Sequence, residues 1–260
     1  KSLENQESLN TNLYIYLLRL ADSNLILSQR LCELCGGAPS LEEELALSNV
    51  SLDLIGQARN WYEYASELDP QNTSPDHLAF RRDVHEFYNL LLVEQKNGHF
   101  ADIIVRQFFF DAWHLATLEA LQDSANERVR AIASKAVKEA TYHLRRSSQW
   151  MIRLGDGTDL SHNKIQKSIN QLWRFTGELL TQDDIEISLA AASIIPSKEK
   201  VSQLWKHTLE TVLTEATLTK PDDNAWMYLG GKQGEHTEHL GFVLAEMQFL
   251  QRAYPDAKVW

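Results

Sequence analysis

The sequence contains little cysteine, glycine or proline, and each shortage argues against a class of protein. Its 260 residues include 2 Cys, 11 Gly and 6 Pro, too few for a disulfide-stapled scaffold or a low-complexity chain. No apolar run reaches the roughly 20 residues that cross a bilayer. No secretory signal is recognisable either, so we expect no membrane segment. Because there is no disulfide framework, we expect a reducing compartment, the cytoplasm.

Basic segments are also missing. Lys and Arg number 25 against 36 Asp and Glu, which gives a formal net charge of -11, and no run of Lys or Arg is longer than two. Because an acidic surface repels phosphate backbones, we expect no nucleic-acid partner. A content of 43% hydrophobic and 23% charged residues is typical of a globular chain with a sizeable core.

The two cysteines, Cys32 and Cys35, have the spacing of a redox pair or of half a zinc site. A zinc site needs two further soft ligands, and the sequence has no second cysteine pair. A redox pair usually opens a helix after a strand, whereas these residues lie at the end of an expected helix. We therefore expect two ordinary reduced cysteines.

Long segments rich in Leu, Ala, Glu and Gln predict an all-α protein. Ser40 before Glu42, Glu43 and Glu44 has the pattern of a helix N-cap with an acidic first turn. We expect one domain over residues 1–260, with a core bundle at about 11–154 and additional helices over 161–253. The expected helices are 11–35, 40–67, 77–95, 99–122, 125–154, 161–180, 184–193, 197–217 and 232–253.

Apolar residues recur at steps of three and four along four of these helices, and each line is interrupted by a polar residue. In the first helix, a line of leucines from Leu13 to Leu34 is interrupted at Asn24. In the second, Leu41, Leu45 and Leu52 enclose Asn49. In the helix expected over 99–122, the apolar line contains Asp111. In the helix expected over 125–154, it contains Ala140 and His143, and Glu139 lies beside them. We expect these polar residues to face the interior.

Such a bundle is typical of ferritin-like di-iron proteins, which use carboxylates from two helices and Glu-x-x-His from the other two. In this chain no Glu is followed by His three residues later. Asp111 and His114 form one Asp-x-x-His, which cannot balance the charge of two iron ions. The residues favour a hydrogen-bonded polar layer without metal. Two alternatives stay open: a self-contained metal-dependent oxidase or oxygenase with a degenerate ligand set at Asp111, His114, His143 and Glu139, and a plain structural dimer.

Several segments resemble the C-subunit family of bacterial phenylacetyl-coenzyme A oxygenases, the ring 1,2-epoxidases. The resemblance runs from about residue 12 to the end of the chain. The segments that carry it are Leu27–Leu31, Asn49–Asn60, Asn89–Gln95, Asn97–Gln107 with Phe110–His114, Lys138–Arg145, Leu172–Thr176, His236–Gly241 and Leu244–Arg252.

The resemblance implies a ferritin-like four-helix bundle with additional C-terminal helices that carries no cofactor of its own. In the family, a paralogous A subunit binds the di-iron centre and epoxidises phenylacetyl-CoA, a reductase component supplies electrons from NADPH, and the C subunit pairs with the A subunit and maintains it. The degenerate metal-site positions are then Asn24, Asn49, Asp111, Ala140 and His143.

The resemblance also places the C subunit near the acyl-CoA substrate. The stretch Glu86, Phe87, Tyr88 and Asn89 becomes a candidate for substrate contact at a subunit boundary, although aromatic residues in an expected helix more often pack in a core. The glycine-rich stretch Gly230–Gly234 lacks the spacing of a phosphate-binding loop and no strand precedes it, so we expect a loop that enters the last helix.

Overall fold

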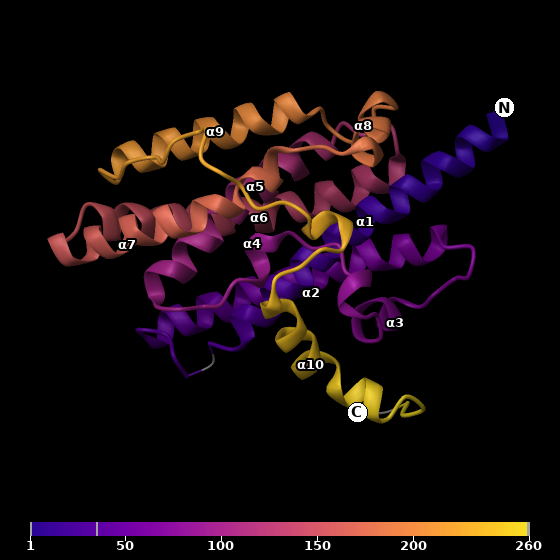
Figure 1. Cartoon of the computed structure of the whole chain (residues 1–260), viewed down its shortest axis with the longest axis horizontal. Helices are drawn as coiled ribbons and strands as arrows, with labels where there is room; N and C mark the ends of the chain where they lie inside the picture. The colour runs from indigo at the N-terminus through magenta and orange to yellow at the C-terminus, as the bar shows by residue number, and fades with distance from the viewer. Residues whose placement is uncertain (1, 35, 259–260) are drawn as a thin grey trace. The chain divides into compact units, whose positions relative to one another are not determined.

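The computed structural model describes residues 2–34 and 36–258 and contains ten α-helices and no strand in those ranges (Figure 1). The all-α prediction is confirmed. The α-helices are α1 (Ser2–Cys32), α2 (Leu41–Leu68), α3 (Pro75–Phe80), α4 (Leu91–Glu94), α5 (Phe100–Leu121), α6 (Glu127–Gly155), α7 (Asp159–Leu172), α8 (Asp184–Ala191), α9 (Lys198–Glu215) and α10 (Glu238–Ala253). The 3-10 helices are η1 (Val84–Glu86), η2 (Trp173–Phe175), η3 (Gly177–Leu180) and η4 (Gly231–Gln233).

The chain divides into two compact units. One comprises the described residues up to Lys96 together with those from Gly230 onward, and the other is Asn97–Leu229. These units do not coincide with the expected division into a core at about 11–154 and additions over 161–253. One domain over residues 1–260 therefore stays a prediction.

The first unit is built on the long pair α1 and α2 (Figure 1), with α3, α4 and α10 packed on it. The Ser40 side chain accepts a hydrogen bond from the Glu43 backbone N–H, so the predicted N-cap of α2 is confirmed. On α1, Leu13, Leu17 and Leu27 are buried, as the heptad spacing predicts. Burial of this face is the main source of stability for a pair of amphipathic helices.

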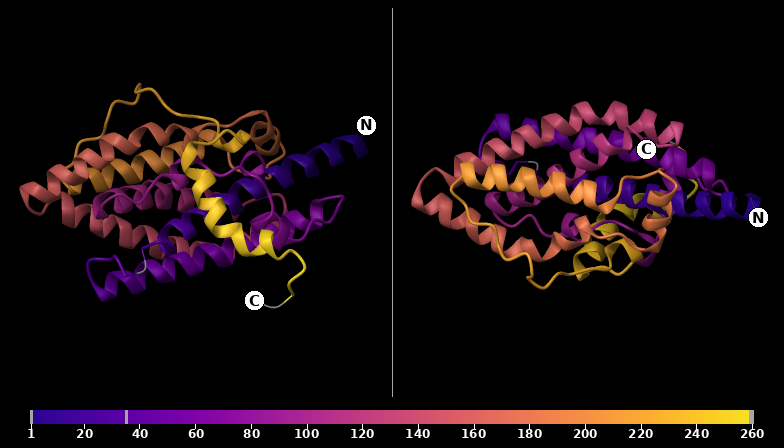
Figure 2. Two further views of the ribbon diagram at one scale, coloured as in Figure 1. Left: turned by 60° about the horizontal axis from the view of Figure 1, so that its bottom comes forward. Right: turned by 90° about the horizontal axis from the view of Figure 1, so that it is seen from above.

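The second unit is built on α5, which packs against α6, α7 and α9 (Figure 2). Ile104, Phe108 and Leu118 on α5 are fully buried. Trp205 of α9 donates a hydrogen bond from Nε1 to the Phe109 carbonyl oxygen, 3.1 Å away. The indole is thus satisfied inside an apolar contact, as a buried Trp requires.

Some predicted helices are wrong. No continuous helix covers 77–95: α3 ends at Phe80, η1 covers three residues, and α4 begins at Leu91. Side chains of α1 take the backbone donors that a helix would need here. The Tyr88 N–H donates to the Asp22 carboxylate and the Leu90 N–H donates to the Ser23 hydroxyl, instead of to carbonyl oxygens one helical turn earlier. The helix expected over 161–180 ends at Leu172 and continues as 3-10 turns.

The helix expected over 232–253 begins later, at Glu238. The stretch Gly230–Gly234 precedes it as a loop with one 3-10 turn, so its prediction as a helix-entry loop is confirmed. None of the helices in the described ranges is long and apolar enough to cross a membrane.

Candidate functional site

The buried polar residues of α5 and α6 form the candidate site in the second unit. Asp111 of α5 is fully buried, and its Oδ1 accepts a hydrogen bond from Gln107 Nε2 at 2.7 Å, one helical turn earlier. Its Oδ2 is buried without a hydrogen-bond donor. His143 of α6 is buried and interacts electrostatically with Asp111. Asp111, Ala140 and His143 all lie on buried faces of this helix pair, as the sequence predicts.

Burial controls the charge of this cluster. Desolvation raises the pKa of Asp111 to about 6, although the nearby His143 opposes the shift. Desolvation, together with a smaller contribution from the charge of His143, lowers the pKa of His114 to about 3. Burial lowers the pKa of His143 as well, against the opposing charges of Asp111 and Glu139. The site therefore holds neutral imidazoles beside a carboxyl group that ionises at a higher pH than an ordinary Asp.

These residues do not fit a di-iron centre. Ala140 supplies no ligand where a Glu-x-x-His pair needs its carboxylate, and Glu139 is only half-buried one position away. Asp111 is the buried carboxylate of α5 and α6, both of which lie wholly within the described ranges. Two iron ions would bring about four positive charges against this single carboxylate. Among residues 2–34 and 36–258, no group of three or more His, Cys, Asp or Glu side chains is placed to hold a metal ion.

The two remaining predicted metal-site positions, Asn24 and Asn49, lie in the first unit and differ in burial. Asn24 of α1 is buried, as expected, and its Nδ2 has no acceptor. Asn49 lies on the exposed side of α2, so its expected place in an interior layer is wrong. The buried face of α2 instead carries Leu47, Val50 and Leu54.

The register of α1 against α2 shows which residue the sequence analysis missed. The Ser51 hydroxyl donates to the Ser28 carbonyl oxygen, and the Tyr62 hydroxyl donates to the Asp22 carboxylate. In this antiparallel register, the level of Asn24 corresponds to α2 residues between about 55 and 60. Gln57 is the buried polar residue of that interval. It was missed because the regular spacing of Leu41, Leu45 and Leu52 indicated the opposite, exposed face of α2 as the inner one.

The substrate-contact candidates, Glu86 to Asn89, do not lie in a packing helix. Glu86 ends η1, and the other three follow it in the segment before α4. Phe87 and Asn89 are fully buried, while Glu86 and Tyr88 keep part of their surface accessible. Substrate contact at this segment stays a prediction, and within it only Glu86 and Tyr88 are placed to make such a contact.

A buried ion pair in the first unit was not anticipated. Arg82 pairs with the Asp22 carboxylate, both side chains being nearly inaccessible, and the guanidinium lies 4.2 Å from the centre of the Phe87 ring. The sequence offers no local signal for this pair, because the two residues are 60 positions apart. It anchors the segment before α4 to α1.

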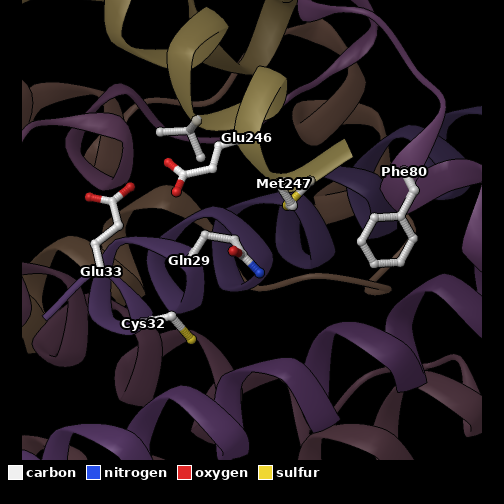
Figure 3. A pocket seen from close by; sticks show the side chains of 7 residues that line it. Gln29, Cys32, Glu33, Phe80, Glu246 and Met247 are labelled. Carbon is white, nitrogen blue, oxygen red and sulfur yellow. The ribbon is translucent and has the colours of Figure 1, made fainter. Parts of the chain in front are cut away.

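A pocket of about 300 Å³ in the same unit is lined by seven residues, six of which are labelled in Figure 3. The carboxylates of Glu33 and Glu246 face each other there (Figure 3), and no Lys or Arg lines it. The Glu33 carboxylate is also paired with Arg30, whose Nη1 lies 3.1 Å from Glu33 Oε2. The Cys32 sulfur lies 3.1 Å from the Ser51 hydroxyl and is a free thiol. The other cysteine, Cys35, lies outside the described residues.

Residues 1–260 match the family described as "Phenylacetic acid catabolic protein". The chain is 52% identical over 240 residues to the C subunit of the 1,2-phenylacetyl-CoA epoxidase of Escherichia coli (strain K12), covering 92% of this chain and 96% of the relative. The all-α structure is consistent with a ferritin-like fold in this family. The chain belongs to the phenylacetic acid catabolic protein family.

Proposed function

We propose that this chain is the accessory subunit of a phenylacetyl-CoA 1,2-epoxidase in aerobic phenylacetate catabolism. It pairs with a catalytic A subunit and maintains that subunit in active form. The similarity to the C subunit of such an epoxidase supports this proposal, since it extends over nearly the full length of both chains. The proposed location is the cytoplasm.

In this proposal the oxidation takes place in the partner. The di-iron centre belongs to the A subunit, and a reductase component delivers electrons from NADPH. The acyl-CoA lies close to the boundary between the subunits, where Glu86 and Tyr88 are the candidates for contact. This chain contributes a folded surface and no redox group.

The observation that carries the proposal is the donor set of α5 and α6. Ala140 stands three residues before His143, and Asp111 is hydrogen-bonded to Gln107 within its own helix. The imidazoles of His114 and His143 are held neutral by burial, which lowers the pKa of each. The helix pair thus folds around a polar cluster that carries at most the single negative charge of Asp111, which is too little to balance two iron ions.

Reconstitution with purified components tests the proposal. With reductase, NADPH and phenylacetyl-CoA, we expect epoxidation by the A subunit only when this chain is present, and none by this chain alone. The double variant Asp111→Asn/His143→Gln should keep the activity of the assembled complex. Turnover by this chain alone, lost in that variant, would establish the alternative of a self-contained oxygenase.

A further inference from the structure

The outer face of α2 carries large apolar side chains that the chain itself leaves uncovered. Leu41, Leu45, Leu52 and Ile55 are 69%, 58%, 65% and 36% exposed. We name these four residues the α2 stripe. They follow heptad a and d spacing, with Ser48 at the position between Leu45 and Leu52, which is the pattern of a helix that packs against another helix.

The α2 stripe is not required for the core of this chain. Leu47, Val50 and Leu54 already bury the opposite face of the helix. Several exposed apolar side chains along one helix face are characteristic of an interaction site.

Gly56 gives an independent indication at the same face. It is exposed in the middle of a long helix, where glycine is unfavourable. A Cβ atom at this position would meet nothing within 4 Å, so nothing in this chain requires a glycine. A missing side chain next to Leu52 and Ile55 lets the backbone of another helix approach closely.

A groove continues the α2 stripe. It begins at Ile55, has a volume of about 470 Å³, and is lined by Leu25, Ala58, Ala79 and Phe80 among others. This volume accommodates one or two large apolar side chains. The stripe and the groove thus offer both a ridge and a hole to a docking helix.

The charges beside the α2 stripe distinguish a second copy of this chain from a different partner helix. Glu42, Glu44 and Asp53 flank the α2 stripe, and Asp76 lines the groove. Arg59 is engaged by Glu63 at 3.2 Å. An identical copy of this chain would bring the same acidic flanks and meet like charges. A helix with an apolar face and basic flanks meets opposite charges.

We propose that the α2 stripe and its groove dock an amphipathic helix of the catalytic A subunit, with Lys or Arg on both sides of its apolar face. The partner's identity rests on the proposed function. The location of the surface rests on α2 alone.

The experiment measures the affinity of the full chain for purified A subunit. The test variant is Leu45→Lys/Leu52→Lys. The control is Leu160→Lys/Ile187→Lys, which replaces residues that are 65% and 54% exposed on α7 and α8. We expect the test variant to fold and melt like the wild type and to bind about tenfold or more weakly, because apolar anchors dominate interfaces. The control should stay within about twofold of the wild-type affinity.

A second variant tests the predicted partner charge. Glu42→Lys/Asp53→Lys should weaken binding to the A subunit and reduce its dependence on salt. If the wild type binds the A subunit and the stripe variant binds equally well, the α2 stripe is not the docking surface, and the proposed function stands. If the wild type does not bind the A subunit, the proposed function fails and the docking proposal falls with it. If the stripe variant disrupts only a homodimer seen by sedimentation, the occupant is a second copy and the proposal is overturned.

Discussion

Glu94 and His236 form a buried pair that ties the entry of α10 to α4. His236 Nδ1 lies 2.9 Å from Glu94 Oε2, and its Nε2 lies 2.6 Å from the Phe87 carbonyl oxygen. A carbonyl oxygen can only accept, so Nε2 donates to Phe87 and Nδ1 shares a hydrogen bond with the Glu94 carboxyl group. Thr237 donates to Glu94 Oε1 from its N–H and its hydroxyl, and Asn89 Nδ2 donates to Oε2. The buried carboxylate is fully satisfied.

Removal of this carboxylate should therefore be costly. We expect Glu94→Ala to lower the free energy of unfolding by about 3–5 kcal/mol, since it leaves His236 Nδ1 and both donors of Thr237 buried without their partner. Urea unfolding measures the change. Glu119→Ala, at an exposed position of α5, serves as the control, and a loss below about 1 kcal/mol for Glu94→Ala would contradict the structure.

Tyr62 provides a second test in the first unit. Its hydroxyl donates to Asp22, and burial followed by the charge of Asp22 raises its pKa well above the ordinary value. Tyr62→Phe removes one donor from a buried carboxylate, so we expect a loss of about 1.5–3 kcal/mol in unfolding free energy. Tyr142→Phe, on the exposed side of α6, should change it by less than about 0.5 kcal/mol. Equal effects of the two variants would rule out the Asp22 contact.

Two glycines should respond to alanine in opposite directions. Gly234 has φ +85°, and a Cβ there would lie 2.5 Å from the His85 carbonyl oxygen, so Gly234→Ala should destabilise the chain by at least about 2 kcal/mol. Gly56 is helical and open to space, so Gly56→Ala should stabilise the isolated chain by about 0.5–1 kcal/mol. Thermal melts of both variants check the signs, and a stable Gly234→Ala would show that the loop is placed differently.

The raised pKa of Asp111 predicts a pH-dependent effect of Asp111→Asn. The folded state holds the Asp111 proton up to pH about 6, whereas the unfolded state releases it near a pKa of about 3.9. The favourable contribution of the protonated carboxyl is full below about pH 4 and is lost as the pH rises through about 6. Asparagine does not titrate and keeps the Gln107 bond, so its stability relative to wild type should grow by up to about 3 kcal/mol between about pH 4 and pH 7. Parallel stability curves would show that Asp111 ionises normally.

The sequence predicted the inner face of α1 and the α5–α6 cluster because their apolar spacing and their burial coincide. Leu17 and Asn24 on α1, and Asp111 and His143, are buried where the pattern places them. The same rule fails on α2, where Leu45 and Leu52 are as regularly spaced and point outward. The spacing of apolar residues alone does not distinguish a helix face that packs inside the chain from one that is exposed on its surface.

The region from Arg82 to Leu90 could not be predicted for a different reason. Its conformation is fixed by the Asp22 carboxylate and the Ser23 hydroxyl, some 60 or more residues earlier in the chain. Local propensity carries no information on such distant contacts. The late start of α10 has a comparable cause, because Gly234 adopts a left-handed conformation against His85.

The iron content of the purified chain shows directly whether its helices hold a metal centre. The protein is expressed in iron-supplemented medium, alone and with the A subunit, and iron is counted per chain. We expect no stoichiometric iron in this chain alone and about two iron ions per A subunit in the complex. Iron retained in stoichiometric amount by this chain alone, and lost in Asp111→Asn/His143→Gln, would contradict this expectation.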